Sequence, residues 1–349
     1  MIRAVRRQTA AIAAAALLLV VAVAPASAQA PEGSVGIRLL EAPSDRVDDP
    51  RARLYIIDHL APGSTISRRI EVSNGLDEQT RIELYAAGAS VDESAFRFFD
   101  GRRRNDVASW TSVDPSSVRV RPGGEAEATV TIDVPSDAPA GEHYAVVWAE
   151  LPAANTRDGV SAVNRVGIRI YLSVGAGGEP ASDFVIESLA GARDDEGNPL
   201  VTAQVRNTGG RALDLAGDLR LVDGPGGLSA GPFPAQLGTT LGIGDTAPVV
   251  VPLDPQIPAG PWTARLALRS GTLERRARAI ITFPAEFGTS SGPVEAIPDE
   301  GRRWLIPLAL ALLLLVLGGL LFFLWKRRRK DDDEQDAPTQ RVPTRTAAR

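Results

Sequence analysis

The stretch Glu125-Ala126-Glu127-Ala128-Thr129-Val130-Thr131-Ile132-Asp133-Val134 alternates polar and apolar side chains over ten residues. Successive side chains of a β-strand point to opposite faces, so this period of two predicts a strand with one buried face. The segment from Val166 to Val174 repeats the pattern, with an apolar residue at every second position. Between residues 34 and 284 we find no convincing helical period. The sequence therefore predicts an all-β fold.

The strand pattern occurs in two blocks, which a glycine-rich break at 175–180 separates. Many short strands with regular turns are typical of a sandwich or a barrel. Both blocks use the same order of signals: Pro139-Ala140-Gly141 precedes Tyr144 in the first, and Pro258-Ala259-Gly260 precedes Trp262 in the second. This repetition predicts two tandem immunoglobulin-like β-sandwiches, at 34–176 and 181–284.

The N-terminus has the three parts of a secretory signal peptide. Arginines at positions 3, 6 and 7 precede an apolar run from Ala10 to Ala24, and Pro25-Ala26-Ser27-Ala28 follows. A basic start, a short apolar middle and a small-x-small site predict a signal peptide over 1–28, with cleavage after Ala28 or, alternatively, after Ala30. An uncleaved anchor is the other interpretation, but about 15 apolar residues are short for a span.

A longer apolar run near the C-terminus predicts a transmembrane helix over 304–325, after a flexible stalk at 285–303 and before a disordered cytoplasmic tail at 326–349. Trp304 and Trp325 flank the run, as is typical of membrane interfaces. A basic cluster after the run favours a cytoplasmic C-terminus and an N-terminus outside the cell. Its members are Lys326, Arg327, Arg328, Arg329 and Lys330. A sortase signal is the rival interpretation, but an LPxTG-like site is missing from the sequence upstream.

The composition argues against several classes of function. The chain has no cysteine, two histidines and a net charge of −5, which leaves little for thiol chemistry, metal binding or nucleic-acid recognition. Two G-x-S-x-G matches, at 227–231 and 288–292, lack the following helix that a nucleophile elbow needs. Acidic residues at 45–49 and 194–198 do not match a calcium loop, and the latter reads as a hairpin turn. We expect no enzyme activity, no catalytic or metal-binding residue and no cofactor.

A segment between two predicted strands offers the candidate binding residues. Arg102, Arg103 and Arg104 lie close in sequence to Trp110 and to three phenylalanines. Charged and aromatic side chains on such a segment suit contact with an anionic polymer or a partner protein. The alternative is a solvated loop that its own aromatic residues hold in place.

Several blocks of the first predicted domain resemble a known family. They are Gly36-Ile37-Arg38-Leu39-Leu40-Glu41-Ala42-Pro43, the run from Asp49 to Gly63, Val134-Pro135, Gly141 to Ala149 and Arg165 to Leu172. Together they resemble the DUF916 domain, also called the WxL-interacting protein peptidoglycan-binding domain, in its actinobacterial form, over about 35–175. The resemblance implies an exported, membrane-anchored β-sandwich that contacts peptidoglycan and holds partner surface proteins near the wall. It implies no particular contact residues.

These observations lead to one expected function and one alternative. The expected function is a non-enzymatic tether of the cell envelope, a single-pass protein of the cell membrane that binds peptidoglycan or a secreted surface protein. The alternative is an accessory subunit of a membrane export or polymer-assembly complex.

Overall fold

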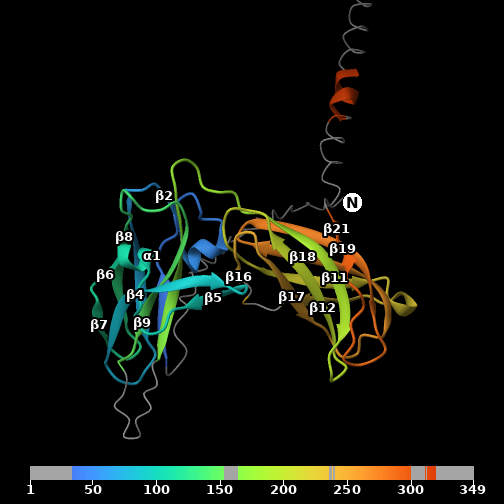
Figure 1. The fold of residues 1–349 in the computed structure, drawn as a ribbon, viewed down its shortest axis with the longest axis horizontal. Coiled ribbons are helices and arrows are strands. Elements are labelled where there is room, and N and C mark those ends of the chain that lie inside the picture. The colour runs from blue at the N-terminus through green and yellow to red at the C-terminus, as the bar shows by residue number, and fades with distance from the viewer. Residues whose placement is uncertain are drawn as a thin grey trace, which may run out of the picture.

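The computed structural model describes residues 34–152, 164–235, 238, 240–299, 311 and 313–319. Two β-sandwiches lie side by side, the first built from strands β1 to β10 and the second from β11 to β21 (Figure 1). Over the described residues, the prediction of a mostly β chain that folds as two sandwiches is confirmed.

The first sandwich packs two sheets face to face, and β8 confirms the alternation in the sequence, because Ala128, Val130 and Ile132 point into the core. One sheet has the order β1 (Val35–Leu39), β3 (Thr65–Asn74), β8 (Glu125–Asp133) and β6 (Thr111–Asp114). The other has the order β2 (Ile56–Leu60), β10 (Arg165–Val174), β9 (Gly141–Glu150), β4 (Thr80–Asp92) and β5 (Ala95–Phe98), and β7 (Ser117–Val120) also pairs with β4.

The second sandwich repeats this two-layer plan around the buried ring of Trp262. Its first sheet has the order β17 (Thr246–Pro252), β12 (Pro199–Asn207), β11 (Phe184–Arg193) and β20 (Val294–Glu295). The other has the order β15 (Ala230–Pro234), β14 (Ala216–Val222), β18 (Gly260–Ser270), β19 (Leu273–Phe283) and β21 (Ile297–Pro298). A small ladder of β13 (Leu213–Asp214) and β16 (Thr240–Leu241) completes this domain.

Three short helical turns lie between the strands, where the sequence predicts no helix. They are η1 (Pro50–Arg53), α1 (Asp106–Trp110) and η2 (Pro225–Gly227). The side chain of Asn105 caps α1 by accepting a hydrogen bond from the Ala108 backbone N–H, at 3.1 Å. Five residues are too few to show a helical period, which is why the pattern misses α1.

The expected stalk at 285–303 is wrong over its described part, residues 285–299. Here the chain turns back and adds β20 beside β11 and β21 beside β19. Ser291 donates its backbone N–H to the Gly191 carbonyl at 2.8 Å, and Ala296 is buried in the second core. Edge pairing and burial hold this segment on the sandwich although its composition resembles a linker.

The expected transmembrane helix at 304–325 is not found. Within the described residues, no helix is long and apolar enough to cross a membrane. Ala311 and residues 313–319 are helical, and the other residues of 304–325 lie outside the described part of the chain. The expected single-pass localisation is corrected to the extent that the described residues do not support it. Trp304, Trp325, the basic cluster 326–330, the tail and the predicted signal peptide 1–28 lie outside the described residues.

Candidate functional site

Two of the four predicted binding residues lie on the outer face of the first sandwich. Arg102 forms ion pairs with Glu83 and, at 3.0 Å, with Glu150. Its guanidinium carbon lies 4.1 Å from the centre of the Tyr85 ring. The guanidinium carbon of Arg103 lies 4.1 Å from the centre of the Phe99 ring. Aromatic rings in this geometry attract a cation, so both arginines are held in place while they remain exposed to solvent.

The other two predicted residues have structural roles. Arg104 donates its Nε–H to the Ala108 carbonyl at 3.0 Å and an Nη2–H to the Thr111 carbonyl at 3.1 Å, which satisfies carbonyl groups at the end of α1. The ring of Trp110 packs 5.1 Å from that of His143 and contacts the first core. The structure therefore divides the predicted set into a surface pair and a structural pair.

Strand β9 brings Trp148 to the same outer face. Its ring lies 4.8 Å from that of Phe98 and 4.3 Å from the Arg165 guanidinium carbon. The Trp148 Nε1–H is buried and has no hydrogen-bond partner among the described residues. We define the arginine–aromatic face by Tyr85, Phe98, Arg102, Trp148 and Arg165. The sequence does not single out Tyr85, Trp148 and Arg165. In β9, Ala145, Val147 and Ala149 belong to the core, whereas Val146 and Trp148 pack together on the opposite face of the strand.

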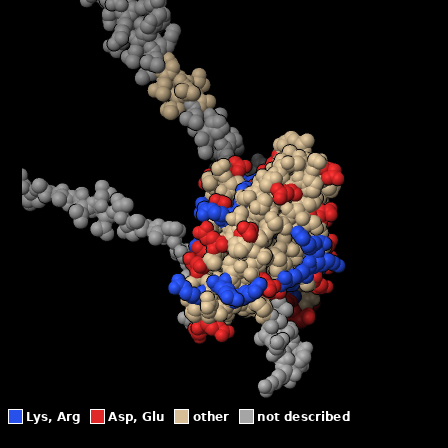
Figure 2. All heavy atoms as spheres, turned by 90° about the vertical axis from the view of Figure 1, so that its left-hand side faces the viewer, with Lys and Arg blue, Asp and Glu red and all other residues tan. Residues whose placement is uncertain are grey.

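Opposite charges occur together on this face. Arg102 pairs here with Glu83 and Glu150. On the side of the first sandwich that is turned away from the second, Figure 2 likewise shows basic and acidic side chains interspersed with uncharged surface. Burial would raise the pKa of Glu150, but hydrogen bonds from Tyr85 and Arg102 outweigh that effect and hold the pKa below its usual value. Arginine, tyrosine and tryptophan are enriched at protein–protein interfaces, so this composition suits a protein partner.

The half of β10 next to this face has one unpaired edge. Strand β10 pairs along its whole length with β9, from Arg165 to Val174. On its other side it pairs with β2 only from Ile170 to Val174. Within the described part of the chain, no strand pairs with residues 165–169 on that side. The backbone N–H and C=O groups along such an edge can accept another strand.

The edge is open because the residues that precede β2 form the η1 turn and do not extend β2 alongside β10. Asp49 caps η1 by accepting a hydrogen bond from the Arg51 N–H at 2.9 Å, and Pro50 occupies the first helical position. The η1 turn carries the chain away from β10, and Leu54, at the end of the turn, is 62% exposed. An exposed leucine therefore lies two residues before Ile56, where the pairing of β2 with β10 begins.

A half-buried cluster around Asp214 joins the two sandwiches. Asp214, in the second domain, forms ion pairs with Arg51 at 2.8 Å and Arg169 at 3.3 Å, both from the first domain. It also accepts hydrogen bonds from the Tyr171 hydroxyl at 2.9 Å and the Thr240 hydroxyl at 2.8 Å. The carboxylate of Asp214 thus connects strands of both domains.

A second buried pair reverses the charges. Glu142, in the first domain, lies 3.3 Å from the Arg211 guanidinium and accepts the Ala212 N–H at 2.7 Å. The Glu142 and Arg211 side chains are only 2% and 5% exposed. Burial lowers the pKa of Arg211, and the Glu142 carboxylate opposes this shift. Glu179, in the interdomain segment, also forms ion pairs with Arg211 and Arg46. These three residues line a cavity of about 260 Å³, so the carboxylate of Glu179 balances charge of the arginines around it.

The candidates for catalysis and metal binding take structural roles. His59 Nδ1 lies 3.1 Å from the Ser173 hydroxyl, and His143 Nε2 lies 3.0 Å from the Pro139 carbonyl. Asp194 accepts the backbone N–H groups of Glu196 and Asn198, which confirms the predicted hairpin turn. The described residues contain no group of three or more side chains that could hold a metal ion.

Comparison with known proteins gives only structural likenesses. No family model matches the chain, and no curated protein matches its sequence. The chain is similar to the solved structure of the YadV chaperone, at 10% identity and a TM-score of 0.37, over 70% of this chain and 100% of that chain. It is also similar to a Salmonella enterica SafA pilin–SafB chaperone structure, at 13% identity and a TM-score of 0.36, over 76% of this chain and 97% of that chain. A third similar structure is that of the class 5 fimbriae chaperone CfaA, at 12% identity and a TM-score of 0.33, over 72% of this chain and 100% of that chain.

The expected function is corrected on one point. The three solved structures contain chaperones, and the expected peptidoglycan tether has no counterpart among them. Peptidoglycan is therefore not proposed as a ligand. The resemblance of 35–175 to the DUF916 domain stays a prediction from the sequence.

Proposed function

We propose that this chain is a non-enzymatic binding protein that takes an extended segment of a secreted partner protein onto the open edge of β10. The observation that carries the proposal is the unpaired side of residues 165–169, within a strand that is fully paired elsewhere. A peptide that adds to a sheet edge gains main-chain hydrogen bonds, and neighbouring side chains select its sequence.

Side chains of the required kind flank the edge. Leu54, 62% exposed, offers an apolar contact at one side. Arg165 and Trp148 stack on the outer face, where alternate side chains of an added strand would lie. Gly167 of β10 lies opposite Trp148 on the neighbouring strand and has no side chain of its own. The edge would therefore favour a segment with apolar and acidic residues at alternating positions.

This proposal is a narrower form of the alternative function, an accessory subunit of an export or assembly complex. Such a subunit must hold the protein that it delivers, and an open strand edge holds an extended segment without requiring a deep pocket. The predicted signal peptide would place both proteins outside the cytoplasm.

Photo-crosslinking in the producing cell tests the proposal. A photoreactive amino acid at position 54 should form an adduct with an exported protein, and the same amino acid at Ile243, 49% exposed in the second domain, should not. Leu54→Lys should weaken partner capture, because a charged, hydrated side chain replaces the apolar surface that Leu54 offers. Ile243→Lys is the matched control. Equal adducts at both positions, or full capture by Leu54→Lys, would overturn the proposal.

A further inference from the structure

The outer face of the second sandwich carries arginines at facing positions on three neighbouring strands. The strand register places Arg220 of β14 opposite Arg265 of β18, and Arg265 opposite Arg278 of β19. All three side chains are exposed. We call these three residues the arginine row.

The fold gains nothing from this arrangement. Like charges directly opposite one another on adjacent strands destabilise a sheet. The row receives one weak ion pair, since Arg220 lies 4.0 Å from Asp218. Within the described residues, Arg265 and Arg278 form no ion pair. Positive charge is therefore concentrated here, and Asp218 is the one carboxylate among the described residues that pairs with the row, at a cost in stability.

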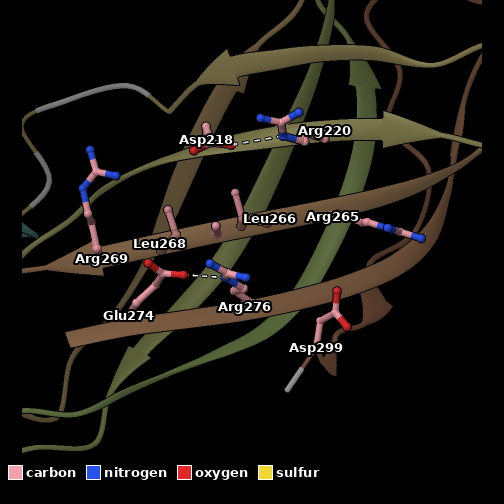
Figure 3. Close-up of a pocket in the computed structure, with 10 residues that line it drawn as sticks. Asp218, Arg220, Arg265, Leu266, Leu268, Arg269, Glu274, Arg276 and Asp299 are labelled. Carbon is pink, nitrogen blue, oxygen red and sulfur yellow. Dashed lines mark hydrogen bonds and ion pairs between the residues drawn. The ribbon is translucent and has the colours of Figure 1, made fainter. Parts of the chain in front are cut away.

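A hollow lies beside the row. Its volume is about 440 Å³, and Figure 3 shows charged side chains from β14, β18 and β19 around it. Ala267, between Arg265 and Arg269 on the outer face of β18, leaves the floor open because its side chain is short. Arg276 borders the same hollow and pairs with Glu274 at 2.5 Å, while Arg269 forms no ion pair among the described residues. Asp218, Glu274 and Asp299 also border the hollow. The lining guanidinium groups that form no ion pair among the described residues are those of Arg265 and Arg269, both on β18.

We infer that this face is a binding site for a phosphate-bearing polymer. A carboxylate is satisfied by one guanidinium fork, whereas each phosphate group offers several oxygens and can be held by more than one arginine. The row crosses two strand spacings, about 10 Å, so it suits a ligand with successive charged groups better than a single ion. Bound phosphates would remove the repulsion within the row.

This inference is independent of the proposed function. The open edge of β10 belongs to the first sandwich, and the arginine row belongs to the second. Leu54→Lys should leave phosphate binding unchanged, and substitutions in the row should leave crosslinking at position 54 unchanged.

Titration calorimetry of the full chain with linear polyphosphate tests the inference. The triple variant Arg220→Gln, Arg265→Gln, Arg278→Gln should raise the Kd at least tenfold. A triple Lys variant should bind more weakly than wild type and more tightly than the Gln variant, because it keeps the charge but loses the guanidinium fork. The matched control is Arg53→Gln, Arg97→Gln, Arg206→Gln, which removes the same charge from scattered sites and should change the Kd less than threefold.

Two further measurements complete the test. Without ligand, the row variant should melt at a higher temperature than wild type, and circular dichroism establishes that it is folded. Polyphosphate should raise the melting temperature of wild type but not that of the row variant. An equal loss of affinity in the control triple would overturn the inference, as would binding to phosphatidylglycerol vesicles without any binding to polyphosphate. Inorganic phosphate at equal phosphorus concentration should bind at least tenfold more weakly, and equal binding would overturn the polymer assignment.

Discussion

Glu150 shows how one carboxylate organises the arginine–aromatic face. It lies at the end of β9, where it accepts hydrogen bonds from the Tyr85 hydroxyl and, at 3.0 Å, from Arg102. Without it, Arg102 would lose one of its two anionic partners and Tyr85 its acceptor. The shape of this face therefore depends on the ionised form of Glu150.

The first prediction concerns pH. Because the pKa of Glu150 in the folded chain lies below the unfolded value of 4.5, its contribution to stability is present above that value and is lost as the pH falls through the folded pKa. Glu150→Gln should therefore be less stable than wild type at neutral pH. The difference in urea midpoint should shrink when both proteins are measured near pH 3. A difference that is constant with pH would show that ionisation does not matter here.

A second prediction concerns Gly167 on β10. A Cβ atom at this position would lie 2.7 Å from both the Trp148 ring and the Val146 side chain. Gly167→Ala should therefore destabilise the chain by roughly 1–3 kcal/mol through overpacking, and it should alter tryptophan fluorescence. The control is Gly178→Ala, because a Cβ there meets nothing within 4 Å. An unchanged unfolding free energy for Gly167→Ala would contradict the close packing.

At the scale of elements, the returning segment 285–299 completes the second sandwich. Removing residues from 285 onward should destabilise this domain by roughly 2–5 kcal/mol, since several backbone hydrogen bonds of about 1 kcal/mol each disappear. They include Arg193 N–H to Thr289 at 2.9 Å and Ala296 N–H to Glu187 at 3.0 Å. Chemical denaturation followed by Trp262 fluorescence measures the effect. If this segment were a free stalk, the truncated chain would be as stable as the full one.

The sequence predicts the elements much better than their connections. The alternation at 125–134 and 166–174 identifies β8 and β10, because a strand with one buried face needs a period of two. Strands β20 and β21 were missed, since two-residue strands show no period and their Gly-, Ser- and Pro-rich surroundings resemble a linker. The open edge of β10 could not be predicted from the sequence either, because it depends on how far the distant strand β2 runs alongside β10.

At the scale of the whole molecule, the joint between the domains contains ion pairs whose partners cannot be identified from the sequence. Arg51 and Asp214 are 163 positions apart, and only the folded chain brings them to 2.8 Å. Ile57, Phe96 and Ala212 add an apolar layer beside them. The joint therefore combines directional ion pairs with close packing, which restricts the angle between the sandwiches.

A fourth prediction tests that joint. The double variant Glu142→Ala, Asp214→Ala leaves the half-buried Arg51 and Arg169 without Asp214 and leaves the buried Arg211 with Glu179 as its remaining carboxylate. Removing one partner of a buried ion pair costs up to about 3–5 kcal/mol. We expect a lower unfolding free energy and a larger radius of gyration by small-angle X-ray scattering, as the domains separate. Glu41→Ala, Glu127→Ala is the matched control, because both carboxylates are exposed and lie 3.5 Å from Arg69. An unchanged radius of gyration in the first variant would show that the apolar layer alone holds the joint.

The reciprocal charges of the joint also have an evolutionary consequence. The first sandwich supplies Arg51, Arg169 and Glu142, and the second supplies Asp214 and Arg211. In a tandem of two copies of the first sandwich, Arg51, Arg169 and Glu142 would face a domain that lacks Asp214 and Arg211. Gene duplication of one domain, or recombination that exchanges one half, would therefore yield chains with an unstable junction. The two sandwiches should be inherited together, as one indivisible module, even where the rest of the chain diverges.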